Sequence, residues 1–137
     1  MIPELLEDHA PSQTTAGFWE AAGRGVLAIQ TCEHCGHAQH PPRPVCSSCV
    51  SLDLVFVPSA GVGTVYSYTV VERGLIPELR GSVPYVLALV DLLDGPRMMA
   101  LLLIDPARAA IGAVVRVTFL QVTPEVALPV FQLDEEG

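Results

Sequence analysis

Alternating and continuous apolar runs fill the second half of the chain and predict five β-strands. Residues 63–71 and 114–122 alternate between apolar and polar positions, as strands with one buried face do. Three further apolar runs complete the set, at 85–90, 97–104 and 128–133. Because the run at 97–104 does not alternate cleanly, we expect that strand to be buried on both faces.

Five strands within about 75 residues favour a small closed barrel, and the five-stranded OB-fold is the economical choice because closure removes exposed sheet edges. Gly61 and Gly63 stand at the beginning of the first strand, where they would let it coil sharply. One short helical turn is expected near residues 105–109. An immunoglobulin-like sandwich is the second choice, since it needs about seven strands.

A short helix is predicted ahead of the strands, from residue 16 to about residue 23. Thr14 or Thr15 would cap its N-terminus, and Gly23 with Gly25 would end it. A helix of about two turns is too short to be stable alone, so it must dock on another element. Its apolar face carries Phe18, Trp19 and Ala22.

Two C-x-x-C pairs carry the strongest chemical signal in the sequence. Cys32-Glu-His-Cys35 and Cys46-Ser-Ser-Cys49 are ten residues apart, and two such knuckles complete a tetrahedral four-sulfur site for one Zn²⁺. Four thiolates leave no open coordination position, so we expect a structural zinc. Two redox dithiols or two disulfides are the alternative. Gly36 follows the first pair, whereas Val50 follows the second and predicts a slightly strained knuckle.

Three histidines and a proline-rich segment lie in or beside the loop between the cysteine pairs. We interpret His34, His37 and His40 as solvated side chains or hydrogen-bonding partners of the knuckles, with a ligand or catalytic role as the alternative. Residues 40–44 (His-Pro-Pro-Arg-Pro) predict a stiff, extended linker. Its Arg43 either meets a phosphate or a partner's carboxylate, or is a plain surface charge.

The charge balance excludes several classes of partner. The chain has 137 residues, with 15 acidic and 7 basic side chains and a formal charge of −8, and every basic residue is Arg. Nucleic acids and anionic membranes both need a surplus of cations. The first residues do not read as a secretory signal, and the longest apolar run, 98–104, is far below the roughly 20 residues of a spanning helix. We therefore expect a cytoplasmic protein, where cysteines bind metal more often than they form disulfides.

The chain shows no sign of a catalytic centre of its own. It has no glycine-rich phosphate loop, no G-x-S-x-G elbow and no convincing nucleophile–base pair. Asp91, Asp94 and Asp105 fall at predicted turns, where such residues usually act as turn and cap residues. Catalysis by the chain alone is therefore not expected.

A long connection between the first two barrel strands, residues 72–83, is the more informative segment. In OB-folds this loop often borders the ligand face. Its apolar residues either contact a partner or an acyl chain, or pack on their own barrel. The segment carries Leu75, Ile76 and Leu79 beside Arg73 and Arg80.

Several motifs in fixed order give the chain a resemblance to a known family. They lie at residues 18–20, 31–36, 41–49, 63–68, 84–90 and 112–117 and run on to the final strand. On these motifs the chain is similar to the acyl-CoA-associated zinc-ribbon/OB-fold family known as domain of unknown function thirty-five. Val50, where a glycine is usual, and the long acidic N-terminal arm depart from the family pattern.

The resemblance implies a rubredoxin-like zinc ribbon followed by an OB-fold, in a non-catalytic accessory subunit. Such proteins bind and stabilise a thiolase-like enzyme (an aldolase, a retro-aldolase or a thiolase) and help to form its acyl-CoA site. An enoyl-CoA hydratase is a second possible partner, and lipid or steroid metabolism is the setting. The family motif carries over the zinc ligands Cys32, Cys35, Cys46 and Cys49 but fixes no CoA contacts.

We therefore expect a mainly β chain in four parts: residues 1–25 as an arm with a short helix, 26–57 as the zinc ribbon, 58–133 as the OB-fold and 134–137 as an acidic tail. A nucleic-acid-binding ribbon/OB module and a stand-alone acyl-CoA enzyme are the alternative functions. The candidate contacts with a partner or with CoA are Phe18, Trp19, Arg43, Arg73, Leu75, Leu79 and Arg80.

Overall fold

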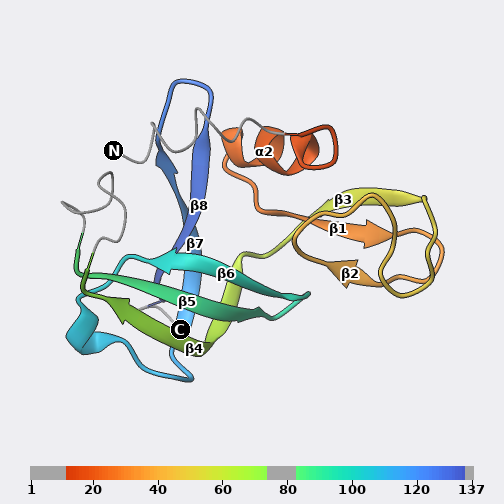
Figure 1. Cartoon of the computed structure of the whole chain (residues 1–137). Coiled ribbons are helices and arrows are strands. Elements are labelled where there is room, and N and C mark those ends of the chain that lie inside the picture. Colours follow the sequence, from red (N-terminus) through yellow and green to blue (C-terminus); the bar gives the residue numbers. More distant parts are fainter. Residues whose placement is uncertain (1–11, 74–82, 135–137) are drawn as a thin grey trace.

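A computed structural model describes residues 12–73 and 83–134 of the chain. In these described residues the chain forms one α-helix, a small sheet and a closed barrel, and the sheet projects to one side of the barrel (Figure 1). Within the described residues, no helix has both the length and the apolar character that crossing a membrane requires. The elements are α2 (Ala16–Gly23), β1 (Ala28–Cys32), β2 (Ala38–Gln39), β3 (Leu54–Pro58), β4 (Val62–Val71), β5 (Tyr85–Leu92), β6 (Arg97–Leu102), the 3₁₀ turn η2 (Pro106–Arg108), β7 (Val114–Gln121) and β8 (Ala127–Leu133).

The barrel has the strand order of an OB-fold, as predicted. Strands follow one another as β4-β5-β6-β8-β7, and β7 pairs with β4 to close the barrel. All strand pairs are antiparallel except β6 with β8. Gly63 is required where β4 crosses β5, because a Cβ there would lie 2.5 Å from the carbonyl oxygen of Asp91. Gly61 has a φ of +72°, and a Cβ there would clash with the side chain of Val117.

The expectation that the strand at 97–104 is buried on both faces is wrong. In β6, the side chains of Met98, Ala100 and Leu102 face the core, and those between them face outward. Met99 is 61% exposed. The continuous apolar run therefore forms a strand that is buried on one face only, and its outer face is also apolar.

Helix α2 covers the predicted residues, but its cap differs from the expected one. Thr15 occupies the N-cap position without a side-chain capping bond. Its hydroxyl instead lies 2.9 Å from the amide nitrogen of Ser12, which donates to it. At the other end, Gly25 adopts a φ of +76°, as an end residue should. Phe18, Ala21 and Ala22 are buried, so the predicted apolar face docks on the rest of the chain.

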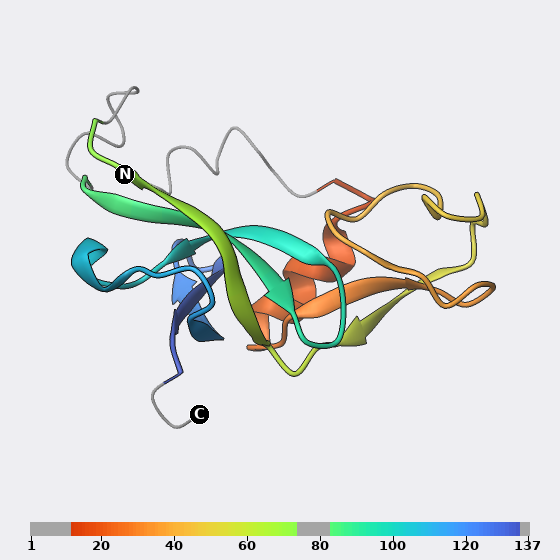
Figure 2. The same cartoon turned by 90° about the horizontal axis from the view of Figure 1, so that it is seen from below.

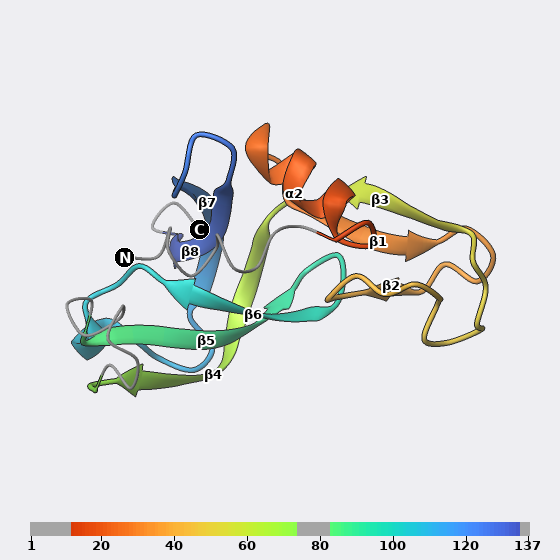
Figure 3. The ribbon, with the colours of Figure 1, turned by 45° about the horizontal axis from the view of Figure 1, so that its top comes forward.

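Ribbon, helix and barrel share one hydrophobic core. The ribbon is the sheet β2-β1-β3, and α2 packs against both β1 and β8, so it lies at the joint between the two modules (Figures 2 and 3). Phe18 of the helix and Ile29 of the ribbon belong to the same buried cluster as Val90 and Phe131 of the barrel. The ribbon is therefore held at a defined place on the barrel.

A single carboxylate fastens the linker between the modules. Asp94, in the β5–β6 turn, accepts a hydrogen bond from the Ser59 hydroxyl at 2.8 Å and another from the Ala60 amide at 2.8 Å. Ser59 in turn accepts one from the amide of Gly61 at 3.0 Å. The predicted role of Asp94 as a turn residue thus extends to the joint between ribbon and barrel.

Candidate metal centre and contact surfaces

Two similar knuckles bring the four cysteines together at the tip of the ribbon. In the first, the Gly36 amide donates to the Cys32 carbonyl oxygen at 2.9 Å. In the second, the Val50 amide donates to the Cys46 carbonyl oxygen at 2.9 Å. These turns aim the four sulfur atoms inward, and all four lie within 4.8 Å of one another.

The sulfur geometry fits a tetrahedral zinc ion. With Zn–S bonds of about 2.3 Å, the sulfurs of a tetrahedral site are about 3.8 Å apart. The Sγ atoms of Cys32 and Cys49 are 3.6 Å apart, and those of Cys35 and Cys46 are also 3.6 Å apart. These two pairs join sulfurs across the two knuckles and have nearly the spacing of a tetrahedral site. The donor set suits a closed structural site and provides no position for a substrate or an activated water.

Backbone amides prepare the first thiol of each knuckle for metal binding. The amide of Cys35, above all, lowers the pKa of the Cys32 thiol to about 6. The amide of Cys49 lowers the pKa of Cys46 in the same way. The thiol of Cys49 behaves in the opposite way. The amide of Ser51 lowers its pKa, but burial and the other three sulfurs outweigh this effect and raise the pKa to about 12. The centre therefore stabilises the thiolates of Cys32 and Cys46 and resists a further negative charge at Cys49 until a cation is present.

The predicted strain in the second knuckle is confirmed. Gly36 and Val50 occupy equivalent positions, with φ of +80° and +66°. Among the described residues, Val50 is the one non-glycine residue with a positive φ. A β-branched side chain is strongly disfavoured in this region of backbone conformation.

Two buried glutamines, which the sequence analysis missed, hold the proline-rich loop to the ribbon. Gln30 and Gln39 are 5% and 4% exposed, and the Nε2 of Gln39 donates to the Oε1 of Gln30 at 2.6 Å. Gln30 also bonds both backbone groups of Arg43, at 2.8 and 2.9 Å. Gln39 accepts from the Ser47 amide at 2.9 Å and donates to the Val45 carbonyl at 3.1 Å. The sequence carried no signal for them, because the burial along β1 does not alternate and β2 is only two residues long.

The histidines lie around the knuckles without joining the sulfur cluster. His34 and His37 are exposed, and the His37 Nε2 is 3.1 Å from the Ser47 hydroxyl, which agrees with its interpretation as a knuckle-supporting residue. His40 is half-buried and packs on the ring of Phe18, with centroids 5.3 Å apart. Burial lowers the pKa of His40. Its imidazole therefore acts as a packing group between ribbon and helix.

The predicted contact residues do not form one surface. Phe18 is only 7% exposed and belongs to the core, so it offers little surface to another molecule. Trp19 is partly buried and meets Phe18 edge to face, with centroids 5.2 Å apart. The side chains of Arg43 and Arg73 are exposed. Arg43 lies on the ribbon and lines a hollow together with Gln13 and Thr14, just before α2, whereas Arg73 follows the end of β4 on the barrel. Leu75, Leu79 and Arg80 lie outside the described residues.

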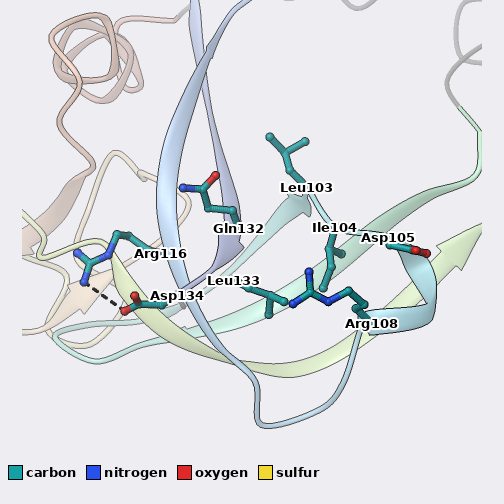
Figure 4. Close-up of a pocket in the computed structure, with 8 residues that line it drawn as sticks. All are labelled: Leu103, Ile104, Asp105, Arg108, Arg116, Gln132, Leu133 and Asp134. Carbon is teal, nitrogen blue, oxygen red and sulfur yellow. Dashed lines mark hydrogen bonds and ion pairs between the residues drawn. The ribbon is translucent and has the colours of Figure 1, made fainter. Parts of the chain in front are cut away.

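A hollow of about 550 Å³ on the barrel was not predicted from the sequence. It lies between the end of β6, η2 and the last residues of β8 (Figure 4). Arg116 pairs with Asp134 across 3.2 Å at one side of the hollow, and Arg108 and Asp105 lie at the other (Figure 4). Two arginines and two aspartates balance one another, so the hollow has no marked preference for an anion. Its lining residues are Leu103, Ile104, Asp105, Arg108, Arg116, Gln132, Leu133 and Asp134.

A four-cysteine ribbon joined to a five-stranded barrel defines the chain as a zinc-ribbon/OB-fold protein. Residues 19–55 match the family described as "ChsH2, rubredoxin-like zinc ribbon domain", and residues 56–120 match "ChsH2, C-terminal OB-fold domain". The chain is also 31% identical over 101 residues to a DUF35 domain-containing scaffold protein of Methanothermobacter thermautotrophicus, which covers 72% of this chain and 75% of the relative. The chain belongs to the DUF35 family.

Other relatives are longer proteins. The chain is 39% identical over 132 residues to a "Probable enoyl-CoA hydratase alpha subunit" of Thermomonospora curvata, covering 95% of this chain and 41% of the relative. It is 37% identical over 134 residues to the 3-oxo-4,17-pregnadiene-20-carboxyl-CoA hydratase alpha subunit of Mycobacterium tuberculosis, covering 97% of this chain and 42% of the relative. The chain thus spans less than half the length of both.

A solved structure matches nearly the whole chain. It is that of an Ltp2-ChsH2(DUF35) aldolase, with a TM-score of 0.81 and 40% sequence identity, covering 90% of this chain and 97% of the other. This similarity extends the family assignment to the arrangement of ribbon and barrel.

Proposed function

We propose that the chain is a non-catalytic accessory subunit of an acyl-CoA-processing complex, in which it binds and stabilises a thiolase-like aldolase or thiolase. The similarity to the Ltp2-ChsH2(DUF35) aldolase carries this proposal. The relative from Methanothermobacter thermautotrophicus, described as a scaffold protein, supports the same role. In this proposal the partner supplies the catalytic residues and this chain supplies a rigid surface.

The site chemistry supports a structural role for the metal. Across residues 12–73 and 83–134, metal-ligating side chains gather in one place, at Cys32, Cys35, Cys46 and Cys49. In the proposal these four residues hold one Zn²⁺, which stabilises a ribbon too small to fold on its own hydrophobic core. The ion takes no part in the reaction, because four thiolates leave it no open position.

The names of the relatives support acyl-CoA as the substrate class of the complex. One relative acts on a pregnadiene carboxyl-CoA, so a steroid or lipid acyl-CoA is the proposed substrate, and an enoyl-CoA hydratase is a proposed second partner. The exposed cations Arg43 and Arg73, and Trp19 on the helix, are the candidate contacts for CoA phosphates or partner groups. We place the protein in the cytoplasm, where thiols stay reduced and available to metal.

The nucleic-acid-binding alternative finds little support on the barrel surface. Tyr66 is 50% exposed, but the Arg97 guanidinium lies 3.3 Å from its ring centroid and is itself bonded to Asp91 at 2.6 Å. One face of the ring is thus covered, and the cation that covers it is already neutralised. A net charge of −8 further opposes contact with phosphates.

The experiment that tests the proposal is purification of the tagged chain from its own host, with mass spectrometry of whatever co-elutes. We expect a thiolase-like enzyme in fixed ratio, active on an acyl-CoA in the complex and losing activity when the two are separated. Nucleic acid in the eluate, or turnover of acyl-CoA by the purified chain alone, would contradict the accessory role.

A further inference from the structure

The outer face of β5 and β6 is apolar, which is unusual for the solvent side of a barrel. Because Val86, Ala88 and Val90 fill the core, the side chains between them on β5 must face outward. The register then sets Leu89 opposite Met99 and Leu87 opposite Leu101 on the neighbouring strand β6. The four outward residues form one continuous patch over two strands that lie side by side (Figure 1). We call this patch the β5–β6 face, and its residues are Leu87, Leu89, Met99 and Leu101.

Charges at the border of the β5–β6 face are already paired. The next outward pair along the same strands is Asp91 with Arg97, bonded at 2.6 Å and 3.3 Å. The guanidinium of Arg97 also stacks on Tyr66, at 3.3 Å from the ring centroid. This end of the face therefore offers neither a cation to a phosphate nor a carboxylate to a basic ligand.

A shallow groove indents this face and has the size of one side chain. Its volume is about 170 Å³, and its lining is mostly apolar. That volume is close to the roughly 150 Å³ of a protein cavity that binds benzene and well below the roughly 300–1,000 Å³ of ordinary ligand pockets. One aromatic or branched side chain fits, and an acyl-CoA does not. The groove is lined by Ser67, Tyr68, Thr69, Leu87, Ala88, Leu89 and Met99.

The net charge of the chain limits the kinds of molecule that can bind to the β5–β6 face. A second copy of the chain would bring together two molecules of charge −8, and nucleic acid or an anionic membrane would be repelled for the same reason. A neutral or basic apolar protein surface meets no such penalty. An apolar patch with a pocket for one anchoring side chain is typical of the centre of a protein–protein interface.

We infer that the β5–β6 face is the surface on which the thiolase-like partner docks, with one aromatic or branched partner side chain seated in the groove beside Met99. The inference rests on the proposed function for the existence of that partner, but it assigns the contact to the barrel. The sequence-predicted contacts Trp19 and Arg43 lie instead on the helix and the ribbon.

The test compares two apolar residues that are both largely exposed, only one of which lies on the β5–β6 face. Met99 is 61% exposed and Ile111, in the loop before β7, is 71% exposed. Met99→Glu and Ile111→Glu add the same charge, and both side chains already face solvent, so folding should survive in both. The affinity of each for the purified partner enzyme recovered with the wild-type chain is measured by calorimetry. Zinc content and melting temperature are recorded for each variant.

We expect Met99→Glu to weaken binding by at least about 30-fold and Ile111→Glu by less than about threefold. Met99→Ala, which adds no charge, should weaken binding by about tenfold and guards against a folding defect in the glutamate variant. Unchanged binding by both Met99 variants would overturn the inference, and so would an equal loss of affinity in Ile111→Glu. A further variant, Trp19→Ala, probes the helix: a loss of affinity confined to that variant would also overturn the inference. If the wild-type chain itself binds no thiolase-like enzyme, the proposed function fails instead.

Discussion

At the scale of single residues, Val50 is held in an unfavourable conformation by the turn that its neighbours require. Its amide donates to the Cys46 carbonyl at 2.9 Å, as the Gly36 amide does to Cys32 in the first knuckle. Both knuckles therefore need a left-handed residue after the second cysteine, but only the first has a glycine there. The valine side chain is 72% exposed, so it gains little packing in return.

Val50→Gly should stabilise the protein by about 1 kcal/mol, because relief of left-handed strain of about 1–2 kcal/mol exceeds the entropy cost of glycine. Chemical unfolding of the zinc-loaded protein measures the change. Val57→Gly is the matched control: Val57 lies in the extended strand β3 and is 43% exposed, so glycine there should be destabilising. A loss of stability in both variants would show that the left-handed turn is not strained.

Gln39 makes a second residue-scale case, because its amide serves three partners in a buried place. Gln39→Met keeps the length of the side chain but leaves the Ser47 amide and the Val45 carbonyl without their bonds. We expect a loss of about 2–3 kcal/mol in the free energy of unfolding. Faster transfer of zinc to a chelator should accompany it, because Ser47 belongs to the second knuckle. Gln132→Met, at an exposed position of β8, should change stability by less than about 0.5 kcal/mol.

At the scale of elements, most of the structure could be predicted from the sequence, because most helices and strands bury one face and expose the other. Residues 63–71 and 114–122 alternate, so β4 and β7 were found nearly residue for residue, and α2 was found from its apolar face and glycines. The strand at 97–104 was misread, because its outer residues are as apolar as its inner ones. Gln30 and Gln39 were missed, since a polar residue type carries no sign of being buried. The β5–β6 face could not be predicted from the sequence, because it depends on the register between the two strands.

The ribbon is the element whose stability depends on the metal. Cys46→Ser removes one of the four sulfurs, so we expect loss of stoichiometric zinc and unfolding of residues in β1–β3. Metal analysis and amide hydrogen exchange measure the two effects. Ser48→Ala, in the same knuckle, leaves all four sulfurs in place and should keep both zinc and fold. A folded, metal-free Cys46→Ser protein would show that the site is not structural.

The pKa values of the cysteine thiols predict how the zinc affinity of the same site depends on pH. Cys49, with a pKa raised to about 12, is protonated in the metal-free protein at neutral pH and must lose its proton to bind zinc. Zinc affinity should therefore fall as the pH falls. Below about pH 6 the loss should steepen, because Cys32, with a pKa lowered to about 6, then takes up a proton as well. Competition with a chelator of known affinity between pH 8 and about pH 5 measures this slope.

At the scale of the whole molecule, the position of the ribbon on the barrel decides what a partner can touch at once. Helix α2 packs against β1 of the ribbon and β8 of the barrel, and the β5–β6 face lies on the barrel alone. The modules are joined by the shared core and by the two hydrogen bonds that Asp94 accepts from the linker. A partner that meets both modules would depend on this joint, whereas one that docks on the β5–β6 face would not.

Asp94→Ala separates these two possibilities. Loss of the bonds from Ser59 and Ala60, each 2.8 Å long, should cost about 1–2 kcal/mol and speed amide exchange in the linker. Asp105→Ala is the control, because Asp105 caps only the η2 turn through the Ala107 amide. If the partner docks on the β5–β6 face, both variants should bind it with nearly wild-type affinity in calorimetry. A large loss in Asp94→Ala alone would place the ribbon in the interface, because only that change loosens the linker between ribbon and barrel.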